Sequence, residues 1–432
     1  MRTILILIFL SGAVVYSQGV FEDALQSSQE QGAADVEING YMRGVSYGGL
    51  SAVDDDPELK SVYGDASLQL RARKGDFGNA YAEVRFREGV EYNESVSKTN
   101  LREAYVTAYV GAFDIMVGQQ IVVWGRADGM NPTNNLTPYN MLVRSPDEDD
   151  RRESNFLMQA HYNAHPFRLE AVWVPTYAPS ILPVKAIPLP PLIKLEDPVY
   201  PDAGLDNSAY AARLDVTLPA VGFSVSYFNG YNPLPGIDIK PMTTALPTVM
   251  LKAWRASVYG ADFSTTIGSF GLRGEAAYRN PHKDYNVLPF VPNPDFQYVV
   301  GMDKSIGDFS VIAQYIGRYV MDFKELTPRP MLPSYELEMK NRMISFQLEE
   351  ITHAVSGRLS QTMLFETLTA ELFGMYNITT ESYLARPQVS YELTDELSVT
   401  AGAELFGGPE ETLYGAVDKA LSAGYVQLKA LF

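Results

Sequence analysis

Basic side chains recur at every second position in two neighbouring segments of the chain. They are Arg71 and Arg73 in the first segment, and Arg85 and Arg87 in the second. Alternate residues of an extended strand point to the same side, so the four guanidiniums would form a ladder on one face. A wall of fixed positive charge attracts anions where it lines a narrow aqueous passage. Pairing with carboxylates, which would leave only a solvated wall, is the competing interpretation.

Further charged residues share this face in the strands predicted below. The basic ones are Arg213, Arg273, Arg279, Arg318, Arg358 and Arg386. The acidic ones are Glu83, Glu103, Asp215, Glu275, Glu371 and Glu404. Basic and acidic walls that face each other would set up a field across a bore, and neighbouring pairs would instead neutralise one another. We expect structural pairing for most of them.

Catalytic and metal-binding patterns are weak. His161 and His165 are four residues apart, which on a strand is roughly 13 Å and too far for a shared metal ion. The chain has no cysteine and no Gly-x-Ser-x-Gly sequence, which excludes a thiol nucleophile and the common hydrolase elbow. We therefore expect no enzyme activity, no cofactor and no metal site.

Two acidic runs, 54–56 and 147–150, fall in expected loops. Carboxylates at this density could hold Ca²⁺, but the runs lack the spaced ligands and the glycine of a calcium loop. We interpret them as solvated loop charge.

Composition narrows the classes of protein. The 432 residues include 52 acidic and 34 basic side chains, a net charge of −18, which disfavours a nucleic-acid partner. The mean hydropathy is −0.10. After the first 17 residues no run of about 18 apolar residues could span a membrane as a helix. A soluble β-rich protein or a transmembrane β-barrel remains.

Apolar and polar residues alternate through most of the chain. Ala66, Leu68 and Leu70, for example, alternate with Ser67 and Gln69, the pattern of a strand with two different faces. We place strands at 36–47, 64–73, 79–88, 100–110, 114–123, 153–164, 167–177, 208–217, 222–231, 253–265, 271–280, 295–304, 308–319, 353–363, 367–378, 382–392, 397–405 and 420–432.

Short and long connections take turns between these strands. The short ones are rich in Gly, Pro and Asp, which supply tight turns. This asymmetry is typical of outer-membrane barrels with short periplasmic turns and long extracellular loops. We predict an all-β fold in which residues 36–432 form a single transmembrane antiparallel β-barrel of about 18 strands, with 16 as the alternative. The segment 320–352 is irregular and could contain a helix or another strand pair.

The chain ends fit export to an outer membrane. Residues 1–17 have the positive start, apolar run and small residues of a cleaved signal peptide. Residues 18–35 are polar and predict a periplasmic lead-in. The last strand ends in Phe432, which resembles the signal that bacterial outer-membrane barrels present to their assembly machinery. We expect the outer membrane of a diderm bacterium.

The segment 117–132 carries the most distinctive motif. A strand ending in Gly118-Gln119-Gln120 is followed by Trp124-Gly125, Asp128-Gly129 and Asn131-Pro132. This resembles porin-like outer-membrane barrels, many of them functionally uncharacterised, and the resemblance implies a channel or an exporter. In general porins the third outside loop, here 124–152, folds back and narrows the bore. The residues that would then line a constriction are Trp124, Arg126, Asp128 and Asn131. Alternatively, the glycines only shape a turn and Trp124 anchors at the outer interface.

The segment 175–201 combines many prolines with apolar residues. Prolines exclude regular helix and central strand, and so apolar a loop is unlikely to stay in water. Packing into the barrel mouth, against a neighbouring subunit or around an apolar solute are the alternatives.

We expect a porin-like channel for passive diffusion of small hydrophilic solutes, and the arginine ladder would favour anionic ones among them. A specific transporter or exporter of an apolar or polymeric compound is the first alternative, and a surface barrel without transport is the second. The partners expected are outer-membrane lipid and lipopolysaccharide, and association into a homo-trimer is left open.

Overall fold

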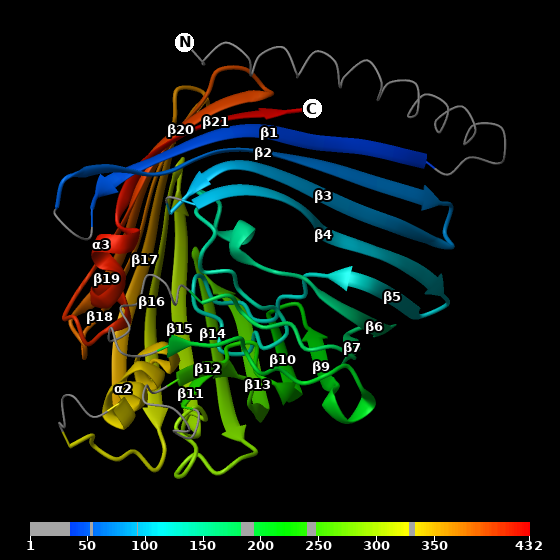
Figure 1. Cartoon of the computed structure of the whole chain (residues 1–432). Helices are drawn as coiled ribbons and strands as arrows, with labels where there is room; N and C mark the ends of the chain where they lie inside the picture. The colour runs from blue at the N-terminus through cyan, green and yellow to red at the C-terminus, as the bar shows by residue number, and fades with distance from the viewer. Residues whose placement is uncertain (1–34, 52–54, 93, 183–193, 240–247, 328–332) are drawn as a thin grey trace.

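The computed structural model describes residues 35–51, 55–92, 94–182, 194–239, 248–327 and 333–432, and its architecture is one closed sheet of 18 strands (Figure 1). The strands of this sheet are β1 (Asp35–Leu50), β2 (Pro57–Lys74), β3 (Gly78–Glu91), β4 (Glu94–Val110), β5 (Phe113–Gln120), β6 (Asn155–Ala164), β7 (Phe167–Val174), β9 (Ala209–Thr217), β10 (Val221–Tyr231), β13 (Arg255–Ile267), β14 (Phe270–Pro281), β15 (Asp295–Ile306), β16 (Phe309–Val320), β17 (Ile351–Met363), β18 (Leu368–Asn377), β19 (Ser382–Glu392), β20 (Leu397–Gly407) and β21 (Ala423–Leu431). The predicted barrel and its strand number are confirmed.

The sheet closes because its first and last strands pair. β1 is antiparallel both to β2, where Tyr41 lies opposite Ser67, and to β21, where Tyr41 lies opposite Leu431. All other neighbours in the sheet follow each other along the chain and are also antiparallel. No strand of the closed sheet is therefore left with an unpaired edge.

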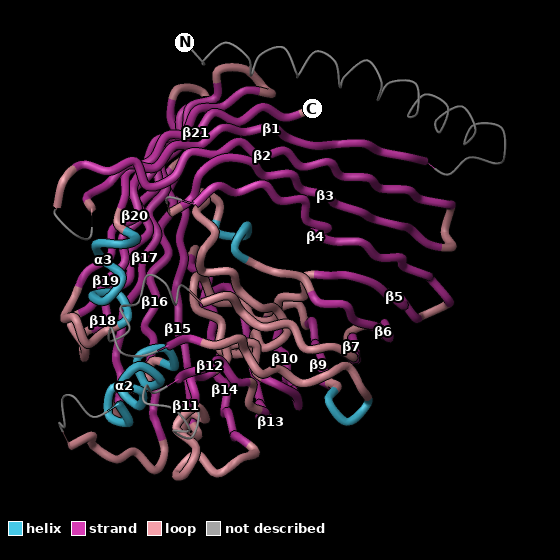
Figure 2. Tube along the Cα trace, in the orientation of Figure 1, coloured by secondary structure: helices cyan, strands magenta, loops and turns pink. Residues whose placement is uncertain are grey.

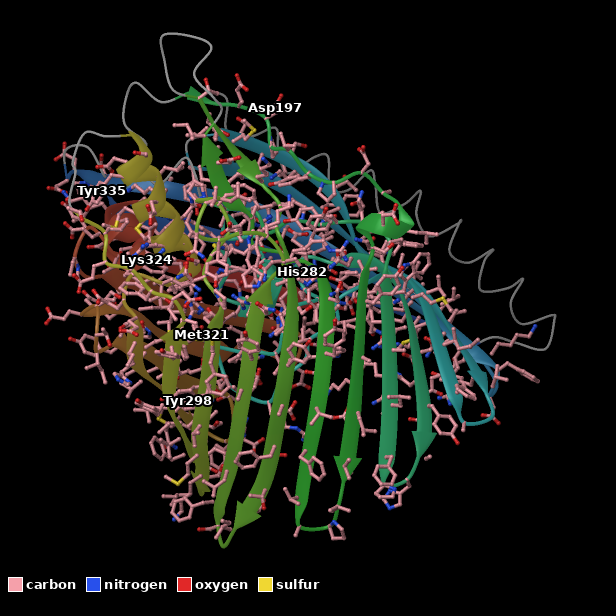
Figure 3. All side chains as sticks on the ribbon, turned by 90° about the horizontal axis from the view of Figure 1, so that it is seen from below. Asp197, His282, Tyr298, Met321, Lys324 and Tyr335 are labelled. Atoms are coloured by element: carbon pink, nitrogen blue, oxygen red, sulfur yellow. The ribbon has the colours of Figure 1, made fainter. Side chains whose placement is uncertain are left out.

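The two faces of the strands differ as the alternation predicts. Charged side chains such as Asp65, Glu83 and Asp262 point inward and are buried, whereas large apolar side chains such as Val62 and Phe86 lie exposed on the outside. Aromatic rings also meet on the outer face of neighbouring strands, and Tyr298 lies on this wall some way from the loops (Figure 3). An apolar outer surface around a polar interior is what a barrel in a hydrocarbon layer requires.

The connections differ between the two ends of the barrel, and we call these ends the short-turn rim and the long-loop rim. Two-residue turns at 111–112, 268–269 and 307–308 belong to the short-turn rim. The long-loop rim carries the extended connections 121–154, 175–208, 232–254, 282–294 and 321–350. The expected alternation of short and long connections is confirmed.

The long loops carry structure of their own. A small sheet forms from β8 (Lys194–Leu195), β11 (Gly236–Ile239) and β12 (Thr248–Lys252). The irregular segment contains the helix α2 (Pro333–Ser345), which settles that alternative for a helix. The helix α3 (Leu413–Leu421) was not predicted; its N-cap Thr412 accepts a hydrogen bond from the Gly415 amide at 3.1 Å. Neither α2 nor α3 is long and apolar enough to cross a membrane.

The predicted N-terminal segments are 1–17 and 18–35; residues 1–34 lie outside the described residues, and Asp35, the last residue of the predicted lead-in, is the first of β1. Most of the proline-rich stretch, 183–193, also lies outside them. At its described start, Leu182 is buried with Ile237 and Leu337 among the loops of the long-loop rim. This end of the segment thus packs against other loops of the long-loop rim, and the alternatives for the rest of the segment stay predictions.

Gly40 of β1 tests the closure of the sheet. Its backbone exchanges two hydrogen bonds with Phe432, of 2.9 and 3.1 Å, and a Cβ added there would lie 2.3 Å from the Ser67 carbonyl oxygen of β2 and 2.5 Å from the Phe432 ring. We expect Gly40→Val to lower the free energy of unfolding by about 2 kcal/mol, as overpacking does. Denaturant titration of the detergent-solubilised barrel measures this. Gly44→Val is the control, because a Cβ on Gly44 meets nothing within 4 Å; equal losses in both variants would contradict the assignment.

Candidate functional site

The connection between β5 and β6, residues 121–154, folds back into the barrel, and we call it the inner loop. Figure 2 shows loop segments inside the ring of strands. Trp124 at its start is buried in an apolar cluster with Leu157 and Phe228. The indole also donates from Nε1 to Glu170 of β7 at 2.9 Å. Trp124 therefore fixes the loop to the inner wall, and the alternative of an anchor at the outer interface is wrong.

Two charged contacts hold the next turn of the loop against β9, β13 and β14. The Arg126 Nε lies 2.5 Å from Asp262 Oδ1, and its Nη2 lies 3.5 Å from Asp215 Oδ1. The Glu275 carboxylate accepts the backbone amides of Arg126 at 3.0 Å and of Thr133 at 2.7 Å. These contacts hold the loop against the part of the wall that follows its own strands around the barrel.

Gly125 and Gly129 have the backbone conformation that this path needs. Their φ angles are 104° and 82°, where residues with a side chain are rarely found. A Cβ on Gly125 would also lie 2.5 Å from a carboxylate oxygen of Glu275. The glycines thus shape the turn, and between them the loop passes from Glu275 of β14 to Phe373 of β18.

Asp128 reaches the far wall of the barrel. Its Oδ2 lies 3.0 Å from the Arg358 Nε of β17, and the same guanidinium lies 2.6 Å from Glu371 of β18. The side-chain amide of Asn131 lies 2.7 Å from the Ala127 carbonyl oxygen. It braces the loop turn that presents Asp128.

A buried ion network fastens the end of the inner loop to β1 and β3. Both Arg43 and Arg85 lie 2.6 Å from the Asp150 carboxylate, and Ser145 donates to it at 2.5 Å. Burial alone would raise the pKa of the Asp150 carboxyl, but the two guanidiniums outweigh it and hold the pKa well below its usual range. The interpretation of the run 147–150 as solvated charge is thus wrong for Asp150, because the inner loop carries it into the lumen. No group of acidic or histidine side chains suited to a metal ion occurs in the described ranges.

The network continues toward the last strands. Arg151 pairs with Glu404 of β20. Arg386 of β19 lies 3.3 Å from Glu404 and 3.2 Å from Glu148 of the inner loop. Loop and wall therefore meet here through alternating charges.

Between the inner loop and the wall of β17 to β21 lies a cavity of about 1570 Å³, the charged cavity. Its described lining includes Asp128 and Asn131 from the loop and Arg358, Arg386 and Lys429 from the wall. Hydroxyl and amide groups from β19 to β21, at Ser390, Thr400 and Gln427, continue the lining toward the short-turn rim. The cavity is thus polar along its described length and suited to water and hydrophilic solutes.

A second cavity of about 1090 Å³ adjoins it toward the long-loop rim, and we call it the apolar cavity. Its walls include Met141 of the inner loop, Phe406 of β20 and Tyr414 of α3. The residues shared by the two linings are Asp128, Gly129, Glu148, Phe373, Arg386 and Glu404. The two cavities therefore meet at the charged contacts between loop and wall.

The structure separates the four arginines of the expected ladder. Arg85 pairs with Glu83 and Asp150, and Arg87 lies 2.9 Å from both Asp65 and Glu91. Arg71 and Arg73 lie closer to the short-turn rim, where Arg71 is exposed and 3.8 Å from Glu37. None of the four is among the described residues that line the charged cavity.

The remaining predicted residues have supporting positions. Arg213 lies 3.0 Å from Asp215, and both belong to the cluster that receives Arg126. Glu103 accepts the backbone amide of Ile121, the first residue of the inner loop, at 2.8 Å. These side chains position the loop and are not part of the described cavity lining.

Sequence reasoning did not identify Arg43, Asp65 and Asp262 as partners of the network. Arg43 and Asp65 lie opposite each other on β1 and β2, each in an alternating segment. The alternation alone was therefore enough to indicate on which face of the sheet their side chains lie. Phe346 after α2 and Tyr414 in α3 line the apolar cavity. No sequence pattern predicted their positions, because these depend on how the loops pack.

No family model and no curated protein matches the sequence. Among solved structures, OccK3 (OpdO) of Pseudomonas aeruginosa matches with a TM-score of 0.54 at 10% identity, over 92% of this chain and 95% of that chain. OccAB3 of Acinetobacter baumannii matches at 0.53 and 9%, over 92% and 99%. The outer membrane protein OpdK of Pseudomonas aeruginosa matches at 0.53 and 7%, over 92% and 98%. The chain has the fold of outer-membrane porins.

Asp150 tests the attachment of the inner loop. We expect Asp150→Asn to lower the free energy of unfolding by about 3 kcal/mol at pH 7, because two buried guanidiniums lose a shared carboxylate. A carboxyl whose folded-state pKa is depressed stabilises the fold above its unfolded pKa of about 3.9 and loses this effect only as the pH falls through the folded value. The difference between wild type and variant should therefore persist from pH 7 to about pH 4 in denaturant titrations.

Asp149→Asn is the matched control, because the Asp149 side chain is 66% exposed and, among the described residues, forms an ion pair with Arg152 alone. Exposed pairs contribute roughly 0.2 to 1 kcal/mol. A loss in Asp149→Asn as large as in Asp150→Asn would contradict the role given to the buried network.

Proposed function

We propose that this protein is an outer-membrane channel through which small hydrophilic solutes diffuse passively. The fold supports this, since barrels of this strand number are too wide for side chains to fill. The observation that carries the proposal is the charged cavity, which runs between the inner loop and one wall and joins the apolar cavity on the other side of the loop contacts. In this proposal the constriction is the level at which Asp128 of the loop lies 3.0 Å from Arg358 of the wall.

The half of the lumen near β6 to β14 supports the same route. There Trp124, Leu136 and Phe290 belong to one buried apolar cluster together with residues of the wall. Such close packing leaves no open passage along this side of the lumen. Solutes would pass on the side of β17 to β21.

The charges of the lining bear on ion preference. Its acidic members outnumber its basic ones; the former are Asp128, Asp147, Glu148, Asp149, Glu371, Glu392 and Glu404, and the latter are Arg152, Arg358, Arg386 and Lys429. A passage with an excess of fixed negative charge favours cations. The anion preference predicted from Arg71, Arg73, Arg85 and Arg87 has not been tested. From the charges of the cavity lining we propose the opposite, a modest preference for cations.

A second candidate function follows from the apolar cavity. Phe373, Phe406, Tyr414 and Met375 line it beside a polar passage, and exposed apolar surface of this extent favours solutes that carry an apolar part. A specific transporter for such compounds is the second candidate. A polymeric substrate and a surface barrel without transport remain sequence-based alternatives.

The remaining expectations belong to the same proposal. We propose the outer membrane of a diderm bacterium as the location, with a signal peptide at 1–17, lipopolysaccharide as a lipid partner and Phe432 as the contact of the assembly machinery. Catalysis is not part of the proposed role, and a homo-trimer is kept as an alternative assembly.

Conduction along this route is tested by placing a bulky side chain in it. Thr400 of β20 lines the charged cavity, whereas the next residue, Ala401, is exposed on the outside. We expect Thr400→Trp to reduce single-channel conductance in planar bilayers to roughly half, because the indole fills part of the passage. Ala401→Trp should leave the conductance unchanged. A wild-type barrel without conductance, or equal effects of both variants, would overturn the proposal.

Ion preference is tested at Glu392, which lines the charged cavity near the short-turn rim. We expect the wild-type reversal potential in a KCl gradient to indicate preference for K⁺. Glu392→Gln should reduce that preference, because one fixed negative charge is removed from the lining. Glu396→Gln changes a turn residue outside the described lining and serves as control. A reversal potential of the opposite sign in the wild type would favour the anion preference.

A further inference from the structure

A separate pocket of about 650 Å³ lies among the loops of the long-loop rim, between the end of β14 and α2. Its apolar walls are formed by Trp254, Phe290, Phe323 and prolines of the connections around them. His282, three residues after Arg279, lies where the strands meet these loops (Figure 3). The pocket shares no described lining residue with the charged or the apolar cavity. It is therefore not a section of the proposed passage.

One cation in this pocket lacks a partner. Across the described part of the chain, the Arg279 guanidinium makes no hydrogen bond and no ion pair, and its Nε is buried. A guanidinium that is partly withdrawn from water without a counter-charge is unfavourable. Arg279 is thus a binding group whose protein partner is missing.

The carboxylate that could serve Arg279 is already occupied. Asp295 lies directly opposite Arg279 in the β14–β15 ladder. Its side chain accepts hydrogen bonds from Gln297 and Gln347, each at 3.1 Å, and lies 3.8 Å from the Arg318 Nε. Two guanidiniums therefore share the surroundings of one acid, which leaves an excess positive charge beside the pocket.

The other polar groups of the lining are satisfied within the protein. Arg342 pairs with Glu338 at 2.9 Å. Asn341 exchanges hydrogen bonds with the backbone of Ile237, both at 2.7 Å. Only Arg279, among the described charged residues that line the pocket, is left to meet a ligand.

We propose that this pocket binds a small organic carboxylate with a compact apolar body. A guanidinium presents a fork of N–H donors that matches a carboxylate, and the aromatic and proline walls match an apolar body. One unpaired cation balances one negative charge, which fits a monoanion better than a doubly charged phosphate. The proposal does not depend on conduction, because the pocket lies outside the passage.

Binding is measured by isothermal titration of the detergent-solubilised full-length barrel with benzoate, and with benzamide as its uncharged counterpart. We expect benzoate to bind and benzamide to bind at least tenfold more weakly. Arg279→Gln should weaken benzoate binding at least tenfold, and Arg279→Lys, which keeps the charge but not the fork, should weaken it less.

Lys324→Gln is the matched control. It removes one positive charge from the same rim, where the Lys324 Nζ contacts Asn286 at 3.1 Å outside the described pocket lining, so benzoate binding should be unchanged. A wild type that does not bind benzoate, an Arg279→Gln variant that binds as well as wild type, or equal binding of benzamide would each overturn the proposal. If Arg279→Gln does not fold, Arg279→Lys decides, and binding as tight as in the wild type counts against the fork. Conductance measured on the same samples shows separately whether the channel proposal holds.

Discussion

The pairing of backbone N–H and C=O groups around a closed ring is the constraint on which the whole structure depends. In a hydrocarbon layer an unpaired peptide group has no water to bind, so a spanning sheet cannot end in a free edge. The chain meets this condition by pairing β1 with β21. Closure also defines an inside and an outside, and each alternating strand then has one face for lipid and one for water.

Inside the ring, ion pairs hold the inner loop to the wall, a part that apolar packing plays in soluble proteins. The inner loop is held by Arg126 and Asp150 through contacts with carboxylates and guanidiniums of the wall. Buried ions are costly to desolvate, and they are stable here because each is met by opposite charges and hydrogen bonds. Around Trp124 the loop packs against the wall as an ordinary apolar core. The charged cavity lies between this loop and the wall of β17 to β21, where Asp128 meets Arg358.

Period-two alternation was sufficient to predict the closed barrel, its 18 strands and the inward-facing charges. The strand 382–392 was placed correctly although Pro387 lies within it; Arg386 and Pro387 simply lack partners on β20, without a change of register. Strands β1 and β2 extend further than predicted at the long-loop rim, to Leu50 and from Pro57, and their pairing there continues past a register shift between Tyr47 and Gly48.

The partners of the charges could not be predicted in the same way. Arg85 and Asp150 are 65 residues apart and meet only because the inner loop folds inward. Alternation indicates on which face of the sheet a side chain lies, but the path of the loops determines which residues it contacts there. The motif with Trp124 and Asp128 predicted an inward loop but not the separate roles of its residues. Trp124 and Arg126 attach the loop to the wall, whereas Asp128 and Asn131 line the charged cavity.

The inner loop also crosses the seam where the two ends of the chain meet. Asp150 is bound to Arg43 of β1, while Arg144 donates to the carbonyl oxygens of Ala420 and Leu421, at the end of α3 and just before β21. The seam joins strands that are farthest apart along the polypeptide, so no tight turn ties them. Instead, the inner loop binds to both sides of this junction from inside the barrel. Separating β1 from β21 would therefore require breaking the contacts of Asp150 and Arg144 as well as the backbone hydrogen bonds between the two strands.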